Sequence, residues 1–268
     1  MESFFIPYQD SSFHAIKYGK GQDVILCFHG YGEEAGTYWI FEELLGDRYS
    51  LIAIDMPFHG KTDWRGPLLF TVHALIEIIN RIIGSPDNQF ILMGYSMGGR
   101  VAFRLLEAIP ERVKKLVLVA PDGLHKNPWQ RFSTQTCIGN RLFKFTMANP
   151  GWLFGLMKTA FALRLLNPSI EKFIRYYLDE EQQRLMLYKR WTTMRNFRPS
   201  ISRLQQVFMK KQIPLHIFFG KYDRVIVAKR GYTFAKKLPS VYIREIEAGH
   251  QLLHQKYAIQ IAEPLMQE

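Results

Sequence analysis

Cysteine is scarce in this chain of 268 residues, and its two cysteines, Cys27 and Cys137, cannot make a disulfide framework. Cys27 lies within an apolar run and is expected to be an inert thiol of the core. A long apolar stretch is missing as well, because Lys158 and Arg164 interrupt the most apolar segment, residues 152–166. That segment is shorter than the roughly 20 residues needed to span a bilayer.

The sequence also lacks the patterns of a secretory signal and of a metal site. Residues 1–7 have no basic stretch followed by an apolar run, so no secretory signal is expected and the predicted location is cytoplasmic. Neither His29 nor His59 has the helical spacing or the nearby carboxylates of a metal site, so both are expected to brace loops. The sequence predicts no metal and no cofactor.

The composition fits one large α/β domain. Hydrophobic residues make up 47% of the chain, enough for a sizeable core. Strand-like runs alternate with helical patterns in the outer parts of the sequence, which predicts a mostly parallel sheet covered by helices on both faces. Residues 4–8 and 13–18 are expected to form an antiparallel hairpin at one sheet edge.

The middle of the chain breaks this alternation. Residues 124–213 contain no convincing strand and separate two parts of a core domain, residues 1–123 and 214–268. Asn-Pro breaks within the segment predict several separate helices. The expected helices cover residues 143–148, 152–166, 170–177, 180–196 and 200–211.

The positive charge is concentrated in the same segment. Residues 124–213 hold 16 Lys and Arg against 4 Asp and Glu, a balance of +12, whereas the rest holds 19 against 20, and together they give the net +11. Many large apolar side chains accompany these charges: Trp129, Phe132, Phe143, Trp152, Phe154, Phe161, Trp191 and Met194. Three interpretations stay open: ordinary amphipathic helices, contact with an anionic membrane surface, or an anionic portion of the substrate. Nucleic-acid binding is not expected, because the basic residues form no recognised motif.

Residues 94–98 (Gly-Tyr-Ser-Met-Gly) carry the strongest chemical signal. They follow the apolar run of residues 90–93 and precede an amphipathic segment, residues 100–108, which predicts a strand, a sharp turn and a helix with Ser96 at the apex. Glycines on both sides remove Cβ atoms that would collide across the turn. The N–H of Met97, at the helix N-terminus, can point at a developing oxyanion.

A serine nucleophile needs a base and a group that orients the base. Asp223 follows the apolar run of residues 214–220, and His250 follows the alternating run of residues 241–246. Because the carboxyl ends of parallel strands meet at one edge of a sheet, Ser96, Asp223 and His250 are expected to come together as nucleophile, orienting acid and base.

These motifs, taken together, resemble the α/β-hydrolase family over nearly the whole chain. The matching pieces are residues 29–32 (His-Gly-Tyr-Gly), 55–62 (Asp-Met-Pro-Phe-His-Gly-Lys-Thr), 94–98, 220–223 (Gly-Lys-Tyr-Asp) and 248–250 (Ala-Gly-His). The resemblance implies an oxyanion hole made by the N–H groups of Tyr31 and Met97. It also implies that residues 124–213 form a cap or lid. Phe58 stands where the family commonly has glycine, and we interpret this as a change in pocket shape.

Two other carboxylates, Asp122 and Asp55, also follow strand-like runs. Asp122 also ends a strand-like run, residues 117–120, and some members of the family take their acid from that strand. Asp223 suits the commoner arrangement, and Asp122 is expected to be a turn residue. Asp55 is expected to be structural, accepting backbone N–H groups of its own turn.

The predicted function is hydrolysis of an ester or thioester with an apolar acyl group, through an acyl-enzyme on Ser96. The absence of an aspartate at position 96 argues against dehalogenase and epoxide hydrolase chemistry. A carbon–carbon bond hydrolase and a cofactor-free perhydrolase would share these motifs. A non-catalytic protein that holds an apolar ligand on the same fold is the alternative from another class.

Overall fold

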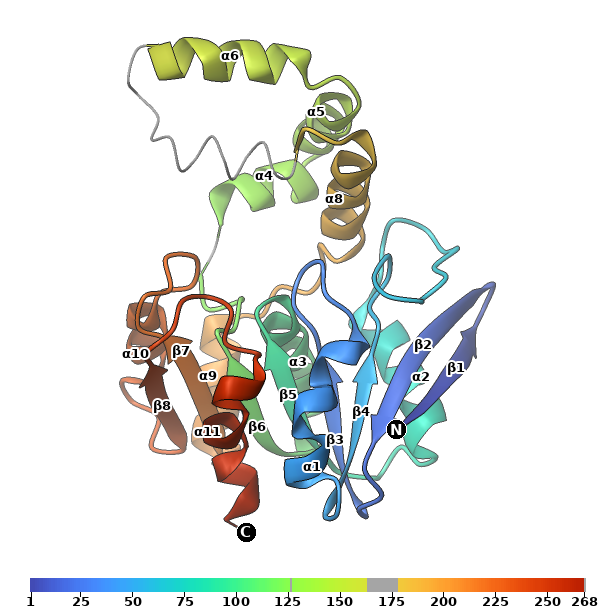
Figure 1. Ribbon diagram of the computed structural model, residues 1–268, viewed down its shortest axis with the longest axis vertical. Coiled ribbons are helices and arrows are strands. Elements are labelled where there is room, and N and C mark those ends of the chain that lie inside the picture. Colours follow the sequence, from blue (N-terminus) through green and yellow to red (C-terminus); the bar gives the residue numbers. More distant parts are fainter. Residues whose placement is uncertain (126, 163–177, 268) are drawn as a thin grey trace. The chain divides into compact units, whose positions relative to one another are not determined.

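An eight-stranded sheet forms the centre of the fold in the computed structural model, which describes residues 1–125, 127–162 and 178–267 (Figure 1). The strand order is β1-β2-β4-β3-β5-β6-β7-β8. The strands are β1 (Glu2–Tyr8), β2 (Ser11–Tyr18), β3 (Asp23–Phe28), β4 (Tyr49–Ile54), β5 (Phe90–Tyr95), β6 (Val113–Val119), β7 (Leu215–Gly220) and β8 (Val241–Ile246). Every residue of β4 and β5 is buried, as expected for central strands covered on both faces.

The strand directions confirm the expected architecture. β1 and β2 pair antiparallel at one edge, which confirms the predicted N-terminal hairpin, and β2 pairs antiparallel with β4. All later neighbours pair in parallel, from β4 and β3 through to β7 and β8. The carboxyl ends of β5, β7 and β8 therefore lie at the same edge of the sheet.

Helices cover both faces of this sheet (Figure 1). One face carries η1 (Ala35–Phe41), α1 (Glu42–Leu45) and α11 (Gln255–Met266), which contact one another. The other face carries α2 (Val72–Ile83), α3 (Met97–Ala108), α9 (Ile201–Lys211) and α10 (Ala228–Ala235); the short η2 (Pro110–Arg112) leads into β6. Cys27 is fully buried, and burial raises the pKa of its thiol well above the usual value; Cys137 is exposed.

The chain divides into two compact units. The first comprises residues 1–66, 71–125 and 196–268, and the second comprises residues 67–70 and 126–195. α9, which falls within the expected insertion of residues 124–213, belongs to the first unit and contacts α3. The helical part of the second unit is therefore shorter than the segment that lacks strands in the sequence.

The described helices of the second unit are α4 (Pro128–Gln135), α5 (Cys137–Ala148), α6 (Gly151–Ala162) and α8 (Glu181–Thr193). The expected helix over residues 170–177 lies outside the described residues. α4 was not expected from the sequence, although Asn127 accepts the N–H groups of Trp129 and Gln130 and thus caps its start. α5 begins earlier than expected because Thr136 caps it, accepting the N–H of Gly139.

The second unit has an interior of its own. Met147, Leu178 and Tyr188 are buried together, with Phe143 and Phe154 packed against them. The guanidinium of Arg184 is buried there as well and donates to the carbonyl oxygens of Met147, Leu178 and Asp179 at 2.9, 2.7 and 3.0 Å. Within the described parts of the chain, none of the helices combines the length and apolarity that crossing a membrane requires.

Candidate active site

Ser96 lies on a strained turn between β5 and α3. Its backbone has φ 48° and ψ −111°, a conformation that costs a side-chain-bearing residue roughly 1–3 kcal/mol. The flanking glycines are required by close approach: a Cβ on Gly98 would lie 1.8 Å from the Phe28 carbonyl oxygen, and one on Gly94 would lie 2.6 Å from the Gly98 carbonyl oxygen. The sequence-based explanation of these glycines is therefore confirmed.

Backbone hydrogen bonds hold the turn in this conformation. The Ser96 N–H donates to the Val119 carbonyl at 2.9 Å, and the Ser96 carbonyl accepts the N–H groups of Gly99 and Asp122, each at 2.9 Å. Met97 is the first residue of α3, so its N–H has no acceptor within the helix. The N-terminal dipole of α3 adds a partial positive charge at this point.

Ser96, His250 and Asp223 form one continuous chain of hydrogen bonds. Ser96 Oγ lies 3.1 Å from His250 Nε2, and His250 Nδ1 lies 2.7 Å from Asp223 Oδ2. Because a carboxylate only accepts hydrogen bonds, His250 carries its proton on Nδ1 and Nε2 accepts from the serine hydroxyl. β7 and β8 bring the last two residues together, since Gly220 pairs with Ile246 at their carboxyl ends.

The environment of Asp223 keeps it ionised. Burial raises the pKa of this carboxyl, but the hydrogen bond and charge of His250 and the N–H groups of Ile226 and Val225 outweigh burial, and the pKa lies below its ordinary value. Asp223 Oδ1 accepts those two N–H groups at 2.9 and 2.7 Å. The side chain of Asp223 is fully buried, whereas that of His250 is 24% exposed.

The rival carboxylate makes different contacts. Asp122 Oδ1 accepts the N–H of Gly123 at 2.7 Å, and its other oxygen lies 3.5 Å from the Arg100 guanidinium. Asp122 thus behaves as the turn residue expected from Pro-Asp-Gly, while Asp223 contacts the imidazole of His250.

Two residues that interact with His250 were not foreseen from the sequence. The hydroxyl of Tyr95 donates to the carbonyl oxygen of His250 at 3.0 Å, with the two rings 5.7 Å apart. Burial raises the pKa of the Glu33 carboxyl above its ordinary value, although the Gly30 N–H and the charge of His250 oppose this. Tyr95 occupies a variable position of the motif at residues 94–98 and Glu33 lies outside the matched motifs, so the tertiary structure identifies both interactions.

The loop after β3 carries the second expected oxyanion donor, Tyr31. Glu33 closes this loop, since its Oε2 accepts the Gly30 N–H at 3.2 Å and its N–H donates to the Gly30 carbonyl at 3.3 Å. His29 accepts the Met56 N–H at 3.1 Å and donates from Nδ1 to the Gly30 carbonyl at 2.7 Å. His29 therefore braces two loops, as expected.

The loop after β4 has a second brace and one strained residue. His59 Nδ1 donates to the Pro57 carbonyl at 2.9 Å, and the His59 ring lies 4.9 Å from that of His29. Phe58 has φ 63°, a left-handed conformation that glycine adopts without strain. This backbone geometry explains why glycine suits the position; that Phe58 shapes a pocket stays a prediction.

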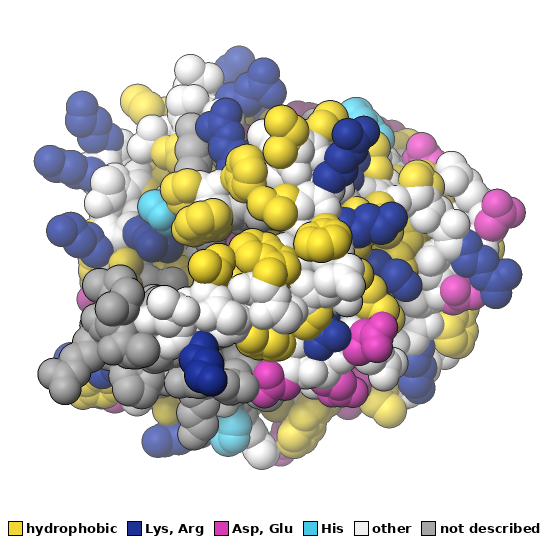
Figure 2. Space-filling view, turned by 90° about the horizontal axis from the view of Figure 1, so that it is seen from above, with side chains coloured by type: hydrophobic (Ala, Val, Ile, Leu, Met, Phe, Trp, Pro, Cys, Tyr) yellow, Lys and Arg dark blue, Asp and Glu magenta, His cyan; other side chains and the backbone are white. Residues whose placement is uncertain are grey.

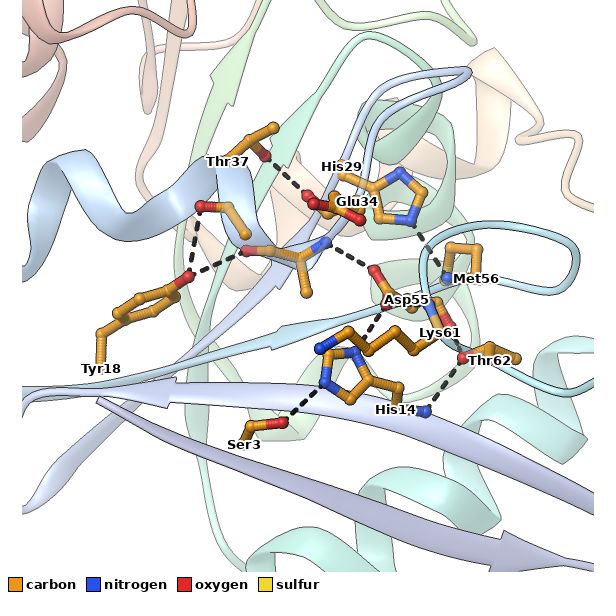
Figure 3. A network of polar contacts seen from close by, with 12 residues as sticks. Ser3, His14, Tyr18, His29, Glu34, Thr37, Asp55, Met56, Lys61 and Thr62 are labelled. Atoms are coloured by element: carbon orange, nitrogen blue, oxygen red, sulfur yellow. Dashed lines mark hydrogen bonds and ion pairs between the residues drawn. The ribbon is translucent and has the colours of Figure 1, made fainter.

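Asp55, at the start of the loop after β4, is the centre of a buried polar network (Figure 3). Its Oδ1 accepts the Ala35 N–H at 2.5 Å, and its Oδ2 accepts the Lys61 N–H at 2.9 Å and lies 2.7 Å from His14 Nδ1. Ser3 Oγ lies 2.9 Å from His14 Nε2. The expectation that Asp55 serves its own turn is confirmed, and the contacts also join β1, β2 and η1.

Among the described residues, no group of three or more His, Cys, Asp or Glu side chains is placed to hold a metal ion. The groups gathered at Ser96 are its hydroxyl, the imidazole of His250, the buried carboxylate of Asp223 and nearby backbone N–H groups. That set can accept a proton from the hydroxyl and can stabilise negative charge beside it.

Comparisons with known proteins agree with the observed fold. Residues 23–257 match the family model described as the alpha/beta hydrolase fold. The uncharacterized hydrolase YugF of Bacillus subtilis is 24% identical over 86% of this chain and 84% of its own length. A pimeloyl-[acyl-carrier protein] methyl ester esterase of Nitrosomonas europaea is 35% identical, but over only 41% of each chain. The thioesterase domain from the curacin biosynthetic pathway has 17% identity, covers 99% of each chain and superposes with a TM-score of 0.63, a likeness of fold.

Proposed function

We propose that this chain, which belongs to the alpha/beta hydrolase fold family, cleaves carboxylic esters or thioesters with an apolar acyl group through an acyl-enzyme on Ser96. The observation that carries the proposal is the unbroken hydrogen-bond chain from Ser96 through His250 to Asp223, with the serine raised on a strained turn. The match to a methyl ester esterase over part of the chain supports the choice of an ester bond.

In the proposed first step, Ser96 Oγ attacks the carbonyl carbon while His250 Nε2 accepts its proton. Asp223 holds the imidazole in the required tautomer and stabilises the imidazolium. The N–H groups of Met97 and Tyr31 donate to the oxyanion, and one such donor contributes about 10²–10³ in rate.

The second half of the reaction uses the same groups. His250 donates its proton to the leaving oxygen or sulfur, which departs and leaves the acyl group on Ser96. Water then attacks the acyl carbon while His250 accepts a proton from it; the bond to Ser96 Oγ breaks, His250 returns the proton to Oγ, and the carboxylic acid is released. Nε2 of His250 therefore carries every proton that is transferred in the proposed cycle.

The helical second unit is proposed to be a cap that selects the acyl group. Its aromatic and methionine side chains suit an apolar chain. Residues 126–195 hold 12 Lys and Arg against 4 Asp and Glu, and this balance of +8 suits a substrate with an anionic portion, such as an acyl-CoA or a phosphorylated ester. Substrate choice by a mobile or fixed cap is a general device of enzymes that sequester their reaction from water.

The test is a substrate series with one variant. Hydrolysis is measured on p-nitrophenyl esters from acetate to palmitate and on the matching acyl-CoA thioesters, for the wild type and Ser96→Ala. The expected result is turnover that depends on chain length and is lost in Ser96→Ala. Turnover that persists in Ser96→Ala would refute the assigned nucleophile. Absence of turnover, together with no labelling of Ser96 by a fluorophosphonate, would favour the ligand-binding alternative.

A further inference from the structure

α5 presents an apolar stripe to solvent. Ile138, Leu142 and Phe145 are 75%, 43% and 56% exposed. They follow one another at intervals of four and three residues, which places them along one side of the helix. An exposed stripe of large apolar side chains is unfavourable in water and marks a surface that another phase or molecule covers.

This stripe is separate from the side of α5 that packs within its own unit. Gly139, Thr146 and Met147 are buried, and Phe143 lies with its ring 5.4 Å from that of Tyr188. The helix therefore has two apolar sides, one used by the core of the second unit and one left outside it. Packing against the core of the second unit accounts for the first apolar side of α5, as in other amphipathic helices. It does not account for the second apolar side, which is exposed to solvent.

α6 repeats the arrangement. Trp152 and Leu156, one turn apart, are 42% and 59% exposed, while Met157 is buried and Leu153 and Phe154 pack against the core of the unit. α4 adds two more exposed aromatic residues, Trp129 and Phe132, at 77% and 39%. Exposed large apolar side chains therefore occur on three consecutive helices, α4, α5 and α6, and not at one isolated position.

Basic residues accompany each stripe. In α5, Arg141 lies three residues after Ile138 and four before Phe145, and Lys144 follows Arg141 three residues later. In α6, Lys158 lies two residues after Leu156; all three basic residues are exposed. The sequence contains no Asp or Glu between Asp122 and Glu171. Figure 2 shows hydrophobic side chains gathered on the face it views, with lysine and arginine side chains around them.

We propose that the surface of α4, α5 and α6 docks on an anionic lipid bilayer, with Trp129, Ile138, Phe145, Trp152 and Leu156 entering the interface. Apolar side chains bordered by Lys and Arg, without acidic residues, form the pattern that binds peripherally to membranes. The anionic headgroups attract the basic border, and tryptophan suits the boundary between headgroups and acyl chains. Because the border of the stripes is positively charged, an anionic bilayer fits this surface better than a neutral apolar surface does.

The experiment is co-sedimentation of the full chain with vesicles. One vesicle is phosphatidylcholine alone, and the other is phosphatidylcholine with phosphatidylglycerol, each at low and high salt. Binding is expected only to the anionic vesicle and should weaken at high salt, since the screening length falls from about 10 Å at 0.1 M to about 3 Å at 1 M. Binding should also shift tryptophan emission to the blue as Trp129 and Trp152 leave water.

Two pairs of substitutions assign the surface. Ile138→Ser with Phe145→Ser removes the stripe of α5, and Arg141→Gln with Lys144→Gln removes its border; each pair should lower the vesicle partition coefficient by roughly tenfold or more. The matched controls are Ile259→Ser, 65% exposed on α11, and Lys236→Gln with Lys237→Gln, exposed after α10; neither should change binding. Thermal unfolding, which does not depend on activity, shows that each variant is folded.

Three outcomes would overturn the proposal. They are absence of binding to the anionic vesicle, equal binding to the neutral one, and equal loss of binding in the controls on α10 and α11. Arg141→Gln with Lys144→Gln changes exposed side chains only. This variant therefore tests the proposal even if Ile138→Ser with Phe145→Ser proves unstable. None of these outcomes depends on whether Ser96 is a nucleophile.

Discussion

His14 Nδ1 lies 2.7 Å from Asp55 Oδ2, the same separation that joins His250 Nδ1 to Asp223 Oδ2. Ser3 completes the first pair as Ser96 completes the second, so the described residues include these two Ser–His–Asp chains. Their surroundings differ. Ser3 lies within a regular antiparallel strand, paired with Ile16, whereas Ser96 lies on a strained turn at the start of a helix.

The first prediction separates these two serines. A fluorophosphonate probe should label the wild type at Ser96 and should leave Ser96→Ala unlabelled, because Ser96 lies at the N-terminus of α3, where N–H groups can stabilise an oxyanion, whereas Ser3 lies within strand β1. Mass spectrometry of the labelled peptides locates the adduct. Labelling of Ser3 would show that the hydrogen-bond chain alone activates a serine in this fold.

The second prediction concerns the acid. Asp223→Asn should lower kcat by about 10⁴, because an amide in that place favours the wrong tautomer of the base. Asp122→Asn is the matched control and should have a far smaller effect, since Asp122 contacts Gly123 and Arg100. Steady-state kinetics on the preferred ester decides between them, and a larger loss in Asp122→Asn would reverse the assignment.

The third prediction concerns stored strain at the turn. Ser96→Gly should be more stable than Ser96→Ala by about 1 kcal/mol, since glycine accepts positive φ and the relief exceeds its cost in the unfolded chain. The same pair at Ser3, in a regular strand, should show the opposite order, because glycine weakens strands. Urea unfolding measures both. Equal stabilities of the two Ser96 variants would mean that the turn carries no strain.

The fourth prediction follows from Glu33. Burial raises the pKa of this carboxyl, so its neutral form favours folding below the ordinary Glu pKa, and that contribution is lost as pH rises through the raised value. Glu33→Gln keeps an acceptor for the Gly30 N–H and cannot ionise. Its stability relative to the wild type should therefore increase as pH rises through this window.

Urea unfolding at a series of pH values tests the effect of Glu33. Glu34→Gln removes a carboxylate from an exposed position of the same loop and serves as the control. If the difference in unfolding free energy between Glu33→Gln and the wild type is constant across pH, the carboxyl of Glu33 does not ionise with a raised pKa.

Much of the fold could be predicted from residue patterns. The apolar runs of β3 to β7, the alternation in β8 and the N-terminal hairpin are local signals, and all of these strands are confirmed. The extent of the helical insertion could not be predicted. α9 is helical like its neighbours in sequence, yet it packs on α3, and helical periodicity alone does not say which partner a helix covers.

The candidate site divides in the same way. The sequence by itself predicted Ser96, His250 and Asp223 as the site, because each follows a strand and parallel strands end at one edge of the sheet. Only the tertiary structure decided that Asp223, and not Asp122, contacts His250, that the Tyr95 hydroxyl bonds to the His250 carbonyl, and that the charge of His250 acts on Glu33. Those contacts depend on the distance and direction of side chains from separate strands and loops, which no local pattern specifies.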